Sequence, residues 1–175
     1  MIFLKAMAAG AALLAAATTA SADQIKHGDL IIENTWTRAT PPRAKAGGGF
    51  ITITNNGSKE DRLVAATSPV SPRVELHEMA VNDGVMQMRE LADGITIPAG
   101  ETISLEPGGL HIMFMGIGEG FKQGSQVPVT LSFEHGGDIE VNLSVAKIGA
   151  KNMEHGSMDH GDHSGHEDHS GHGHN

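Results

Sequence analysis

The sequence predicts an all-β domain, a sandwich or a barrel, between an N-terminal leader and a disordered C-terminal tail. Stretches rich in β-branched residues alternate apolar with polar side chains, as residues 49–55 (GFITITN) do. Turn-forming sequences such as Asp83-Gly84 and 107–109 (PGG) separate these stretches. No apolar stripe with the 3.6-residue period of a helix persists for three turns. Short strands joined by such turns favour a β-sandwich or barrel.

Residues 1–22 have the pattern of a secretory signal peptide and are predicted to lie outside the fold. Lys5 supplies the positive charge, residues 6–17 supply the apolar run, and Ala20-Ser21-Ala22 is a cleavage signal. A membrane-spanning helix needs roughly 20 apolar residues, and this run is shorter. We therefore expect cleavage before Asp23 and a periplasmic protein that is not inserted in a membrane.

Residues 23–150 are predicted to form the folded domain, and nine stretches in it have the pattern of strands. These stretches cover residues 30–36, 49–55, 63–67, 73–81, 85–91, 102–105, 111–116, 127–133 and 139–148. Aromatic residues make up only 3% of the chain, so the core must consist mainly of Ile, Val and Leu. Phe50, Phe114 and Phe133 are the expected aromatic members of that core.

The composition excludes several classes of function. The 175-residue chain has a formal net charge of −9 and no basic cluster, which argues against binding to nucleic acid. It has no cysteine, which removes disulfides, thiol nucleophiles, Cys-based zinc sites and CxxC redox chemistry. What stands out is the combination of 11 His with 9 Met.

One cluster of these residues is His111-Ile112-Met113, with Met115 two residues later. Residues i and i+2 of a strand point to the same side of the sheet. His111, Met113 and Met115 therefore share one face. Ile112 and Phe114 point the other way, into the expected core.

A second cluster, 77–79 (HEM), precedes the predicted turn at Asp83-Gly84. If this turn is a hairpin loop of two residues, Met79 lies opposite Met88, and Met88 lies diagonal to His77. The same register places Val81 opposite Met86 and Asn82 opposite Val85. His77, Met79, Met86 and Met88 then project from one face, whereas a three-residue loop would separate them.

Two imidazoles with several thioethers are a ligand set that favours Cu(I). Thioether sulfur has little affinity for Ca²⁺ or Mg²⁺, and zinc sites use Cys, His or carboxylate ligands. Methionine forms no disulfide, so it holds copper in a compartment where a pair of cysteines would be oxidised. A set of four donors leaves no vacancy for a substrate, which favours a copper carrier over an enzyme. A blue-copper electron carrier is excluded because it needs a Cys thiolate.

The spacing of these residues resembles the signature of the PCuAC family of periplasmic copper(I) chaperones. His77 is followed after ten residues by Met88, and after a further 22 residues by His111-x-Met113. Residues 107–116 (PGGLHIMFMG) and 36–42 (WTRATPP) are also similar to that family. The second gap is one residue longer than in the family pattern, which an extra residue in a loop absorbs.

The resemblance implies a cupredoxin-like Greek-key β-sandwich that binds Cu(I) through His77, Met88, His111 and Met113. The residues themselves leave Met79 and Met115 open as rival ligands, and Met86 as a weaker one. The resemblance also implies delivery of copper to the CuA centre of cytochrome c oxidase. The partner would be the copper subunit of the oxidase or another periplasmic copper chaperone, and we expect a monomer. The alternative function is sequestration of copper or zinc for metal tolerance.

Residues 151–175 form a tail whose only apolar residues are Met153 and Met158, so it is predicted to be disordered. A short repeat runs through it: HGDHSG at 160–165 recurs as HEDHSG at 166–171. The tail carries seven of the histidines: His155, His160, His163, His166, His169, His172 and His174. Imidazole nitrogens beside carboxylate oxygens suit Cu(II), Ni(II) or Zn(II), so the tail is predicted to capture Cu(II) as a second site.

Overall fold

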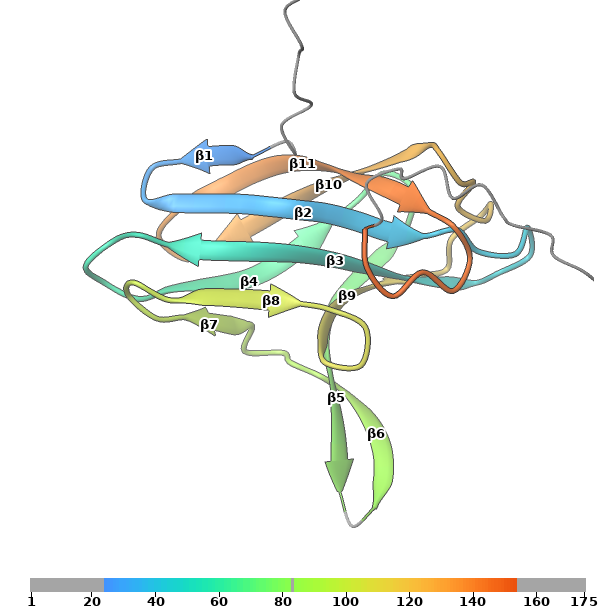
Figure 1. Ribbon diagram of the computed structural model, residues 1–175, viewed down its shortest axis with the longest axis horizontal. Coiled ribbons are helices and arrows are strands. Elements are labelled where there is room, and N and C mark those ends of the chain that lie inside the picture. The colour runs from blue at the N-terminus through green and yellow to red at the C-terminus, as the bar shows by residue number, and fades with distance from the viewer. Residues whose placement is uncertain (1–23, 83, 154–175) are drawn as a thin grey trace, which may run out of the picture.

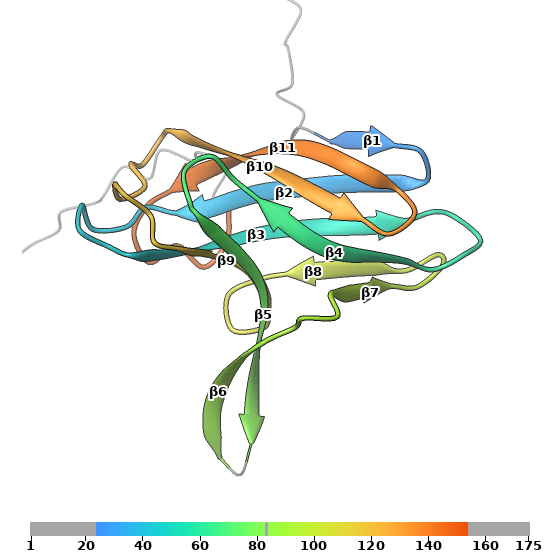
Figure 2. The ribbon, with the colours of Figure 1, turned by 180° about the vertical axis from the view of Figure 1, so that it is seen from behind.

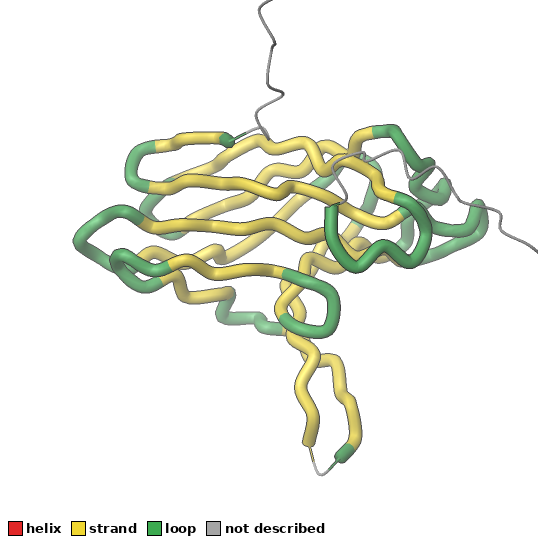
Figure 3. The backbone as a smooth tube through the Cα atoms, in the orientation of Figure 1, coloured by secondary structure: helices red, strands yellow, loops and turns green. Residues whose placement is uncertain are grey.

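The computed structural model describes residues 24–82 and 84–153, and every regular element in these residues is a β-strand (Figure 3). Within those residues, no helix has the length and apolar character that crossing a membrane requires. The predicted leader, its cleavage position and the tail histidines from His155 to His174 lie outside the described residues. For the described part of the chain, the prediction of an all-β fold is confirmed.

Eleven strands follow one another in the part of the chain that the structure describes. They are β1 (Ile25–His27), β2 (Leu30–Arg38), β3 (Ala46–Asn55), β4 (Asp61–Thr67), β5 (Arg73–Asn82), β6 (Val85–Glu90), β7 (Ile95–Ile97), β8 (Thr102–Leu105), β9 (Leu110–Met115), β10 (Gln126–Phe133) and β11 (Gly137–Ala146). The sequence pattern predicted all of them except β1 and β7. Those two strands have three residues each, which is too short for an alternating pattern to be visible.

The strands pair in the order β6-β5-β9-β3-β2-β11-β10-β4-β7. Strand β3 shares one edge between two partners, because Ala46 to Gly49 pair with β9 and Ile51 to Thr54 pair with β8. The chain of strands folds into two layers: β10 and β4 lie behind β2 and β3 in Figure 1 and in front of them in Figure 2. This is the sandwich that the sequence predicted.

The main core lies between the two layers and consists largely of aliphatic side chains. Phe114 and Phe133 belong to it, as predicted, and so does Phe121, whose ring meets that of Phe114 edge-on at a centroid distance of 5.5 Å. Phe50 is buried elsewhere, because it packs on Trp36 in a second cluster with ring centroids 4.6 Å apart. The alternation of β3 places Phe50 on the opposite side from the core residue Ile51.

Close packing explains the glycine at the centre of β3. A Cβ atom on Gly49 would lie 2.8 Å from Cδ1 of Leu143 and 2.9 Å from Cε2 of Phe114. Real side chains do not tolerate such distances, so a larger residue would push the two layers apart. Strand β9 therefore lies against β3 with the ring of Phe114 directly over the glycine backbone.

Strands β5 and β6 form an arm that projects from the sandwich (Figures 1 and 2). The first part of β5, from Arg73 to Glu78, pairs with β9 in the body. The second part, from His77 to Asn82, pairs with β6. His77 takes part in both pairings, so it stands where the arm leaves the body.

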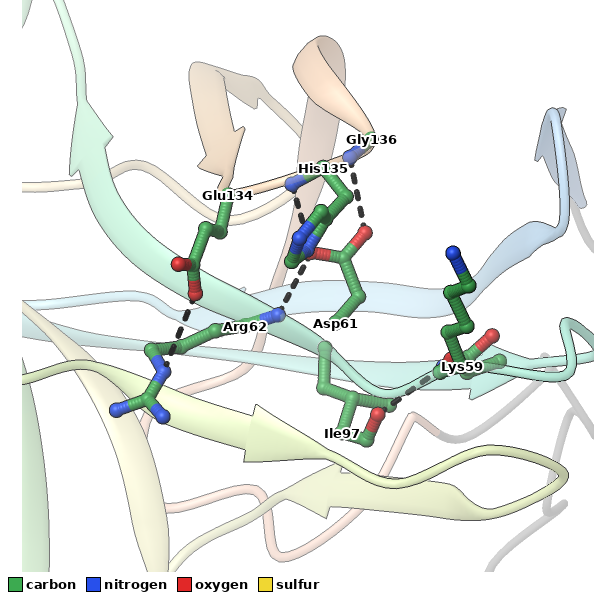
Figure 4. A network of polar contacts seen from close by, with 8 residues as sticks. Lys59, Asp61, Arg62, Ile97, Glu134, His135 and Gly136 are labelled. Carbon is green, nitrogen blue, oxygen red and sulfur yellow. Dashed lines mark hydrogen bonds and ion pairs between the residues drawn. The ribbon is translucent and has the colours of Figure 1, made fainter.

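At the start of β4, the carboxylate of Asp61 binds the turn between β10 and β11 (Figure 4). Oδ1 accepts hydrogen bonds from the backbone N–H groups of Arg62 and His135, at 2.7 and 3.0 Å, and Oδ2 accepts one from Gly136 at 2.9 Å. Burial alone would raise the pKa of the Asp61 carboxyl. These three backbone bonds, with a smaller effect of the His135 charge, outweigh burial and lower the pKa below 3.8.

We predict that Asp61→Asn lowers the free energy of unfolding by about 2 kcal/mol at pH 7. This is the size of the contribution expected from a hydrogen bond to a charged acceptor. Because the folded-state pKa is lowered, the carboxylate stabilises the fold above pH 3.8, and this contribution is lost as the pH falls through that pKa. Denaturant unfolding at pH 7 and at about pH 3 measures both effects. Asp138→Asn, an exposed substitution on β11, is the control. A loss that is equal at both pH values contradicts the prediction.

Candidate metal site

Two histidines face each other across adjacent strands at the base of the arm. His77 on β5 pairs directly with His111 on β9. Paired residues of antiparallel strands project from the same side of the sheet. The ring centroids are 5.7 Å apart and the planes meet at 61°. The sequence indicated both histidines but not that they form a cross-strand pair.

The predicted register of the β5–β6 hairpin is confirmed. Asn82 pairs with Val85, so residues 83–84 connect the strands, and Gly84 has a φ of 78°. Met79 pairs with Met88, and Val81 pairs with Met86. The methionines of the arm therefore project from the same side as His77, as the two-residue loop required.

The predicted faces of β9 are confirmed as well. Ile112 and Phe114 are completely buried in the main core. The alternation of the strand then places His111, Met113 and Met115 on the outer side. Strand β5 follows the same rule, since Leu76 is buried in the core and its neighbour His77 faces outward.

The register ranks the methionines by their distance from the histidine pair. Met113 pairs with Glu75 and so lies diagonal to His77, and Met88, opposite Met79, also lies diagonal to His77. Met79 is two residues from His77 on the same strand. All three lie within reach of His77, and Met113 is also two residues from His111 on the same strand.

The other two candidates lie farther along the strands. Met115 pairs with Arg73, four residues from His77, and Met86 pairs with Val81, four residues away in the opposite direction. The Cα atom of each therefore lies about 14 Å along the strands from the level of the pair, at roughly 3.4 Å per residue. Neither side chain spans that distance, so the structure separates Met115 and Met86 from the histidines.

The site is buried at one end and open at the other. His111 is only 6% exposed, whereas Met88 on the outer strand of the arm is 48% exposed. Gly48 of β3 pairs with Met113, and the ring of Phe50 lies beside this glycine, with Cζ 3.3 Å from the position of a Cβ atom. The exposure of Met88 thus makes the site accessible from the arm.

Hydrogen bonds fix the two imidazoles differently. Nδ1 of His111 lies 3.0 Å from the carbonyl oxygen of Gly109, which can only accept, so this nitrogen carries the proton. The lone pair of His111 is therefore on Nε2. Nε2 of His77 lies 2.7 Å from Oε2 of Glu75, and Nδ1 of His77 is buried without a hydrogen-bond partner.

Burial lowers the pKa of His111 below its ordinary value of 6.5. The bond to the carbonyl of Gly109 acts in the opposite direction, and the nearby charge of His77 adds to the lowering. The neutral form of His111 is therefore dominant at neutral pH. A metal ion requires this form, because only a neutral imidazole has a lone pair to offer.

The donors available at this site suit a soft metal ion. The described residues contain no group of three or more His, Cys, Asp or Glu side chains arranged to hold a metal. What accompanies the two imidazoles is a set of thioethers, which favour Cu(I). The buried, unpartnered Nδ1 of His77 is a further sign, since such an atom is costly unless something binds it.

Glu75 is the residue near the histidines that the sequence analysis missed. It contacts His77, and its carboxylate is largely buried. A signal was present, because residue i−2 of a strand lies on the same face as a candidate ligand. A second omission is the segment after β11, whose Ala150 is buried against Trp36 and Phe50 on the outer face. Met153 also packs against this cluster, so the described chain ends on the face that carries the donors.

Comparison with solved structures defines the class of the fold. A copper-bound PCuAC domain from PmoF2 superposes with a TM-score of 0.61 and 22% sequence identity, covering 71% of this chain and 98% of that domain. The solution structure of CuI-DR1885 from Deinococcus radiodurans gives a TM-score of 0.54 and 28% identity, covering 79% of this chain and 87% of that chain. The fold is that of PCuAC domains, as the resemblance implied.

Comparison of sequences defines the family. Residues 30–145 match the family described as "Putative lipoprotein LpqE-like". The protein named "Putative lipoprotein Lxx21020", from Leifsonia xyli subsp. xyli (strain CTCB07), is 34% identical over 121 residues, which cover 69% of this chain and 72% of that protein. The chain belongs to the LpqE-like family.

We predict that His111 titrates below pH 6.5 in the metal-free protein, because burial disfavours the charged imidazolium. The sign follows from linkage: the unfolded chain binds this proton more readily, so the fold loses stability as the pH falls from 6.5 to the folded-state pKa. Nuclear magnetic resonance (NMR) titration of ¹⁵N-labelled histidine measures the midpoint. A midpoint at or above 6.5 contradicts the prediction.

Proposed function

We propose that this protein is a periplasmic carrier of Cu(I), held by His77, Met88, His111 and Met113. The observation that carries the proposal is the cross-strand pair of His77 and His111, with thioethers projecting beside it from the same face. The copper-bound PCuAC domain of PmoF2 and CuI-DR1885 support the choice of copper. Periplasmic localisation rests on the signal-peptide pattern and on the lipoprotein names of the family and its relative.

The chemistry of the donors favours Cu(I) over other ions. Two neutral imidazoles with two thioethers carry no charge and satisfy a soft, singly charged ion, whereas Zn²⁺ sites use Cys, His or carboxylate ligands and not thioethers. The lowered pKa of His111 keeps this imidazole available to the ion at neutral pH. Copper is the cargo of such a site. The chain has no cysteine thiol that could reduce Cu(II), so the copper must arrive as Cu(I).

The exposure of the site favours transfer rather than catalysis. Met88 is half exposed on a projecting arm, while His111 is buried in the sheet. An acceptor protein could replace the thioether of Met88 first and leave the imidazole of His111 until last. Copper would then move by ligand exchange, without being released into solution.

The recipient that we propose is the copper subunit of cytochrome c oxidase at its CuA centre, or another periplasmic copper chaperone, met by a monomer of this protein. Incubating the loaded protein with an apo oxidase subunit tests the recipient. The appearance of CuA absorbance supports delivery. Tight binding of Cu(I) without any transfer favours sequestration for metal tolerance instead.

We predict that Met88→Leu and Met113→Leu each weaken Cu(I) binding by at least roughly 100-fold. Substituting a residue that only hydrogen-bonds to a metal ligand costs roughly 10–100-fold in affinity, so a loss of this size or larger indicates a direct ligand. Leucine keeps the volume and hydrophobicity of methionine but has no sulfur. Competition with a chromophoric Cu(I) chelator measures the affinity.

The matched controls are Met86→Leu and Met115→Leu, on the same strands as the proposed ligands but far from the histidine pair. We expect both to bind Cu(I) as tightly as the wild type. Met79→Leu tests the nearest rival, because a loss in that variant with Met88→Leu unaffected would transfer the ligand role to Met79. Unchanged affinity in Met88→Leu, Met113→Leu and Met79→Leu together would sink the proposal.

We also propose that the tail histidines, His155 to His174, bind Cu(II) beside the first site. Their nitrogen donors and the neighbouring carboxylates suit Cu(II) better than Cu(I). The described chain ends at Met153, against Trp36 and Phe50, on the outer face that carries the Cu(I) donors. The tail is therefore attached to the chain at that face.

Replacing the seven tail histidines by alanine in the full chain is predicted to remove Cu(II) binding and leave Cu(I) affinity unchanged. In the wild type, Cu(II) affinity should fall as the pH drops below about 6.5, because protonated imidazole binds no metal. Isothermal titration with Cu(II) measures both effects. Cu(II) binding that survives the substitutions contradicts this role of the tail.

A further inference from the structure

A chain of three polar side chains runs along β5 and ends at the proposed copper ligand. Nε of Arg73 lies 2.8 Å from Oε1 of Glu75, and Oε2 of Glu75 lies 2.7 Å from Nε2 of His77. The side chains of Glu75 and His77 are only 14% and 12% exposed, whereas that of Arg73 is 65% exposed. Each oxygen of this shielded carboxylate therefore has its own donor.

This contact determines which nitrogen of His77 carries the proton. An ionised carboxylate only accepts hydrogen bonds, so the neutral imidazole must hold its proton on Nε2 and donate it to Glu75. The lone pair is then on Nδ1. That atom is buried and has no hydrogen-bond partner, which is unfavourable unless a ligand takes it.

The opposite histidine shows the complementary arrangement. Nδ1 of His111 donates to the carbonyl of Gly109, which leaves the lone pair of His111 on Nε2. Each imidazole is thus held through one nitrogen by a fixed acceptor. The two free lone pairs are Nδ1 of His77 and Nε2 of His111.

We propose that Glu75 is a positioning residue that holds His77 as an Nε2–H tautomer and so presents Nδ1 to Cu(I). The inference rests on the proposed function, since it concerns the same copper site. A carboxylate that accepts from the second nitrogen of a metal-binding histidine fixes the ring and raises its basicity. Arg73 restrains the other oxygen of Glu75 and so keeps the carboxylate in place.

Two other roles for Glu75 fit the contacts less well. As a copper ligand, a carboxylate oxygen is a hard donor and suits Cu(I) poorly. As a latch displaced when copper takes Nε2, Glu75 would lose its buried partner and remain shielded from water. The buried Nδ1 would also stay unpartnered. The positioning role leaves neither group unsatisfied.

Strand β5 also supplies a matched control. Glu78 is on the opposite side of the strand from Glu75 and is paired with an arginine, Arg89, at 2.7 Å. Glu78→Gln therefore removes a carboxylate and its ion pair with an arginine, but it removes no hydrogen bond of the His77 imidazole. Glu75→Leu removes the acceptor for Nε2–H, and Glu75→Gln keeps a neutral acceptor in its place.

The first measurement uses the full-length wild-type chain, free of metal, with ¹⁵N-labelled histidine at about pH 8, above the ordinary imidazole pKa of about 6.5. Its ¹⁵N chemical shifts should show His77 as the Nε2–H tautomer. On loading with Cu(I), the shift of the non-protonated nitrogen should change at Nδ1 of His77 and at Nε2 of His111. This readout needs no variant, so it stands even where a substitution disturbs folding.

The second measurement is chelator competition for Cu(I) in the variants. Glu75→Leu should weaken binding by roughly 10–100-fold, the range for losing such a partner of a ligand. Glu75→Gln should lie between Glu75→Leu and the wild type, and Glu78→Gln should bind as the wild type does. The tautomer signal of His77 should become mixed in Glu75→Leu only.

Three results would overturn the inference. They are an Nδ1–H tautomer of His77, a Cu(I)-induced shift at its Nε2, or Cu(I) binding by Glu75→Leu that is at least as tight as in the wild type. In the last case, tighter binding would identify Glu75 as a group that competes with copper for His77. If the wild type does not take up Cu(I) at all, the proposed function fails instead. The two failures are thus distinguishable.

Discussion

The pairing of β5 with β9 is the constraint on which the rest of the site depends. On its inner side, Leu76, Ile112 and Phe114 are buried in the main core, and they hold the two strands in register. On its outer side, the same register sets His77 opposite His111. A slip of one residue would turn every side chain of a strand to the other face, so the core that stabilises the fold also fixes the donors. The stability of the fold and the placement of the proposed metal donors therefore depend on the same pair of strands.

The arm gives this rigid pair an accessible side. Its hairpin places Met88 and Met79 beside His77, yet it projects from the sandwich (Figure 1) and leaves Met88 half exposed. The body contributes the buried imidazole of His111, whose pKa is lowered by its surroundings. A firmly held nitrogen donor next to an exposed sulfur donor suits a protein that must retain copper and also give it up. In the proposed role of Glu75, its contact with Nε2 of His77 leaves Nδ1 of that imidazole as the nitrogen that binds copper.

Much of this arrangement was predictable because it is local. The alternation of β9 placed Ile112 and Phe114 inside, and the loop at residues 83–84 set the register of Met79 with Met88. Other features were not predictable from local patterns. Strands β1 and β7 have three residues each, which is too short to show a period. Phe50 lies outside the main core, on the face where Trp36 and the segment after β11 cover it. These contacts join residues far apart in the chain.

The sequence by itself determined the chemistry of the donors, the all-β class and the face on which each donor stands within its own strand. Those properties follow from residue type and from the two-residue period of a strand, which need no knowledge of the neighbours. Only the tertiary structure decided that β9 lies next to β5, that His77 therefore meets His111, and that Met115 and Met86 lie apart from them. Which strands become neighbours depends on packing in the whole core, where Gly49 lies against Phe114 and Leu143. The sequence pattern of a single strand does not contain that information.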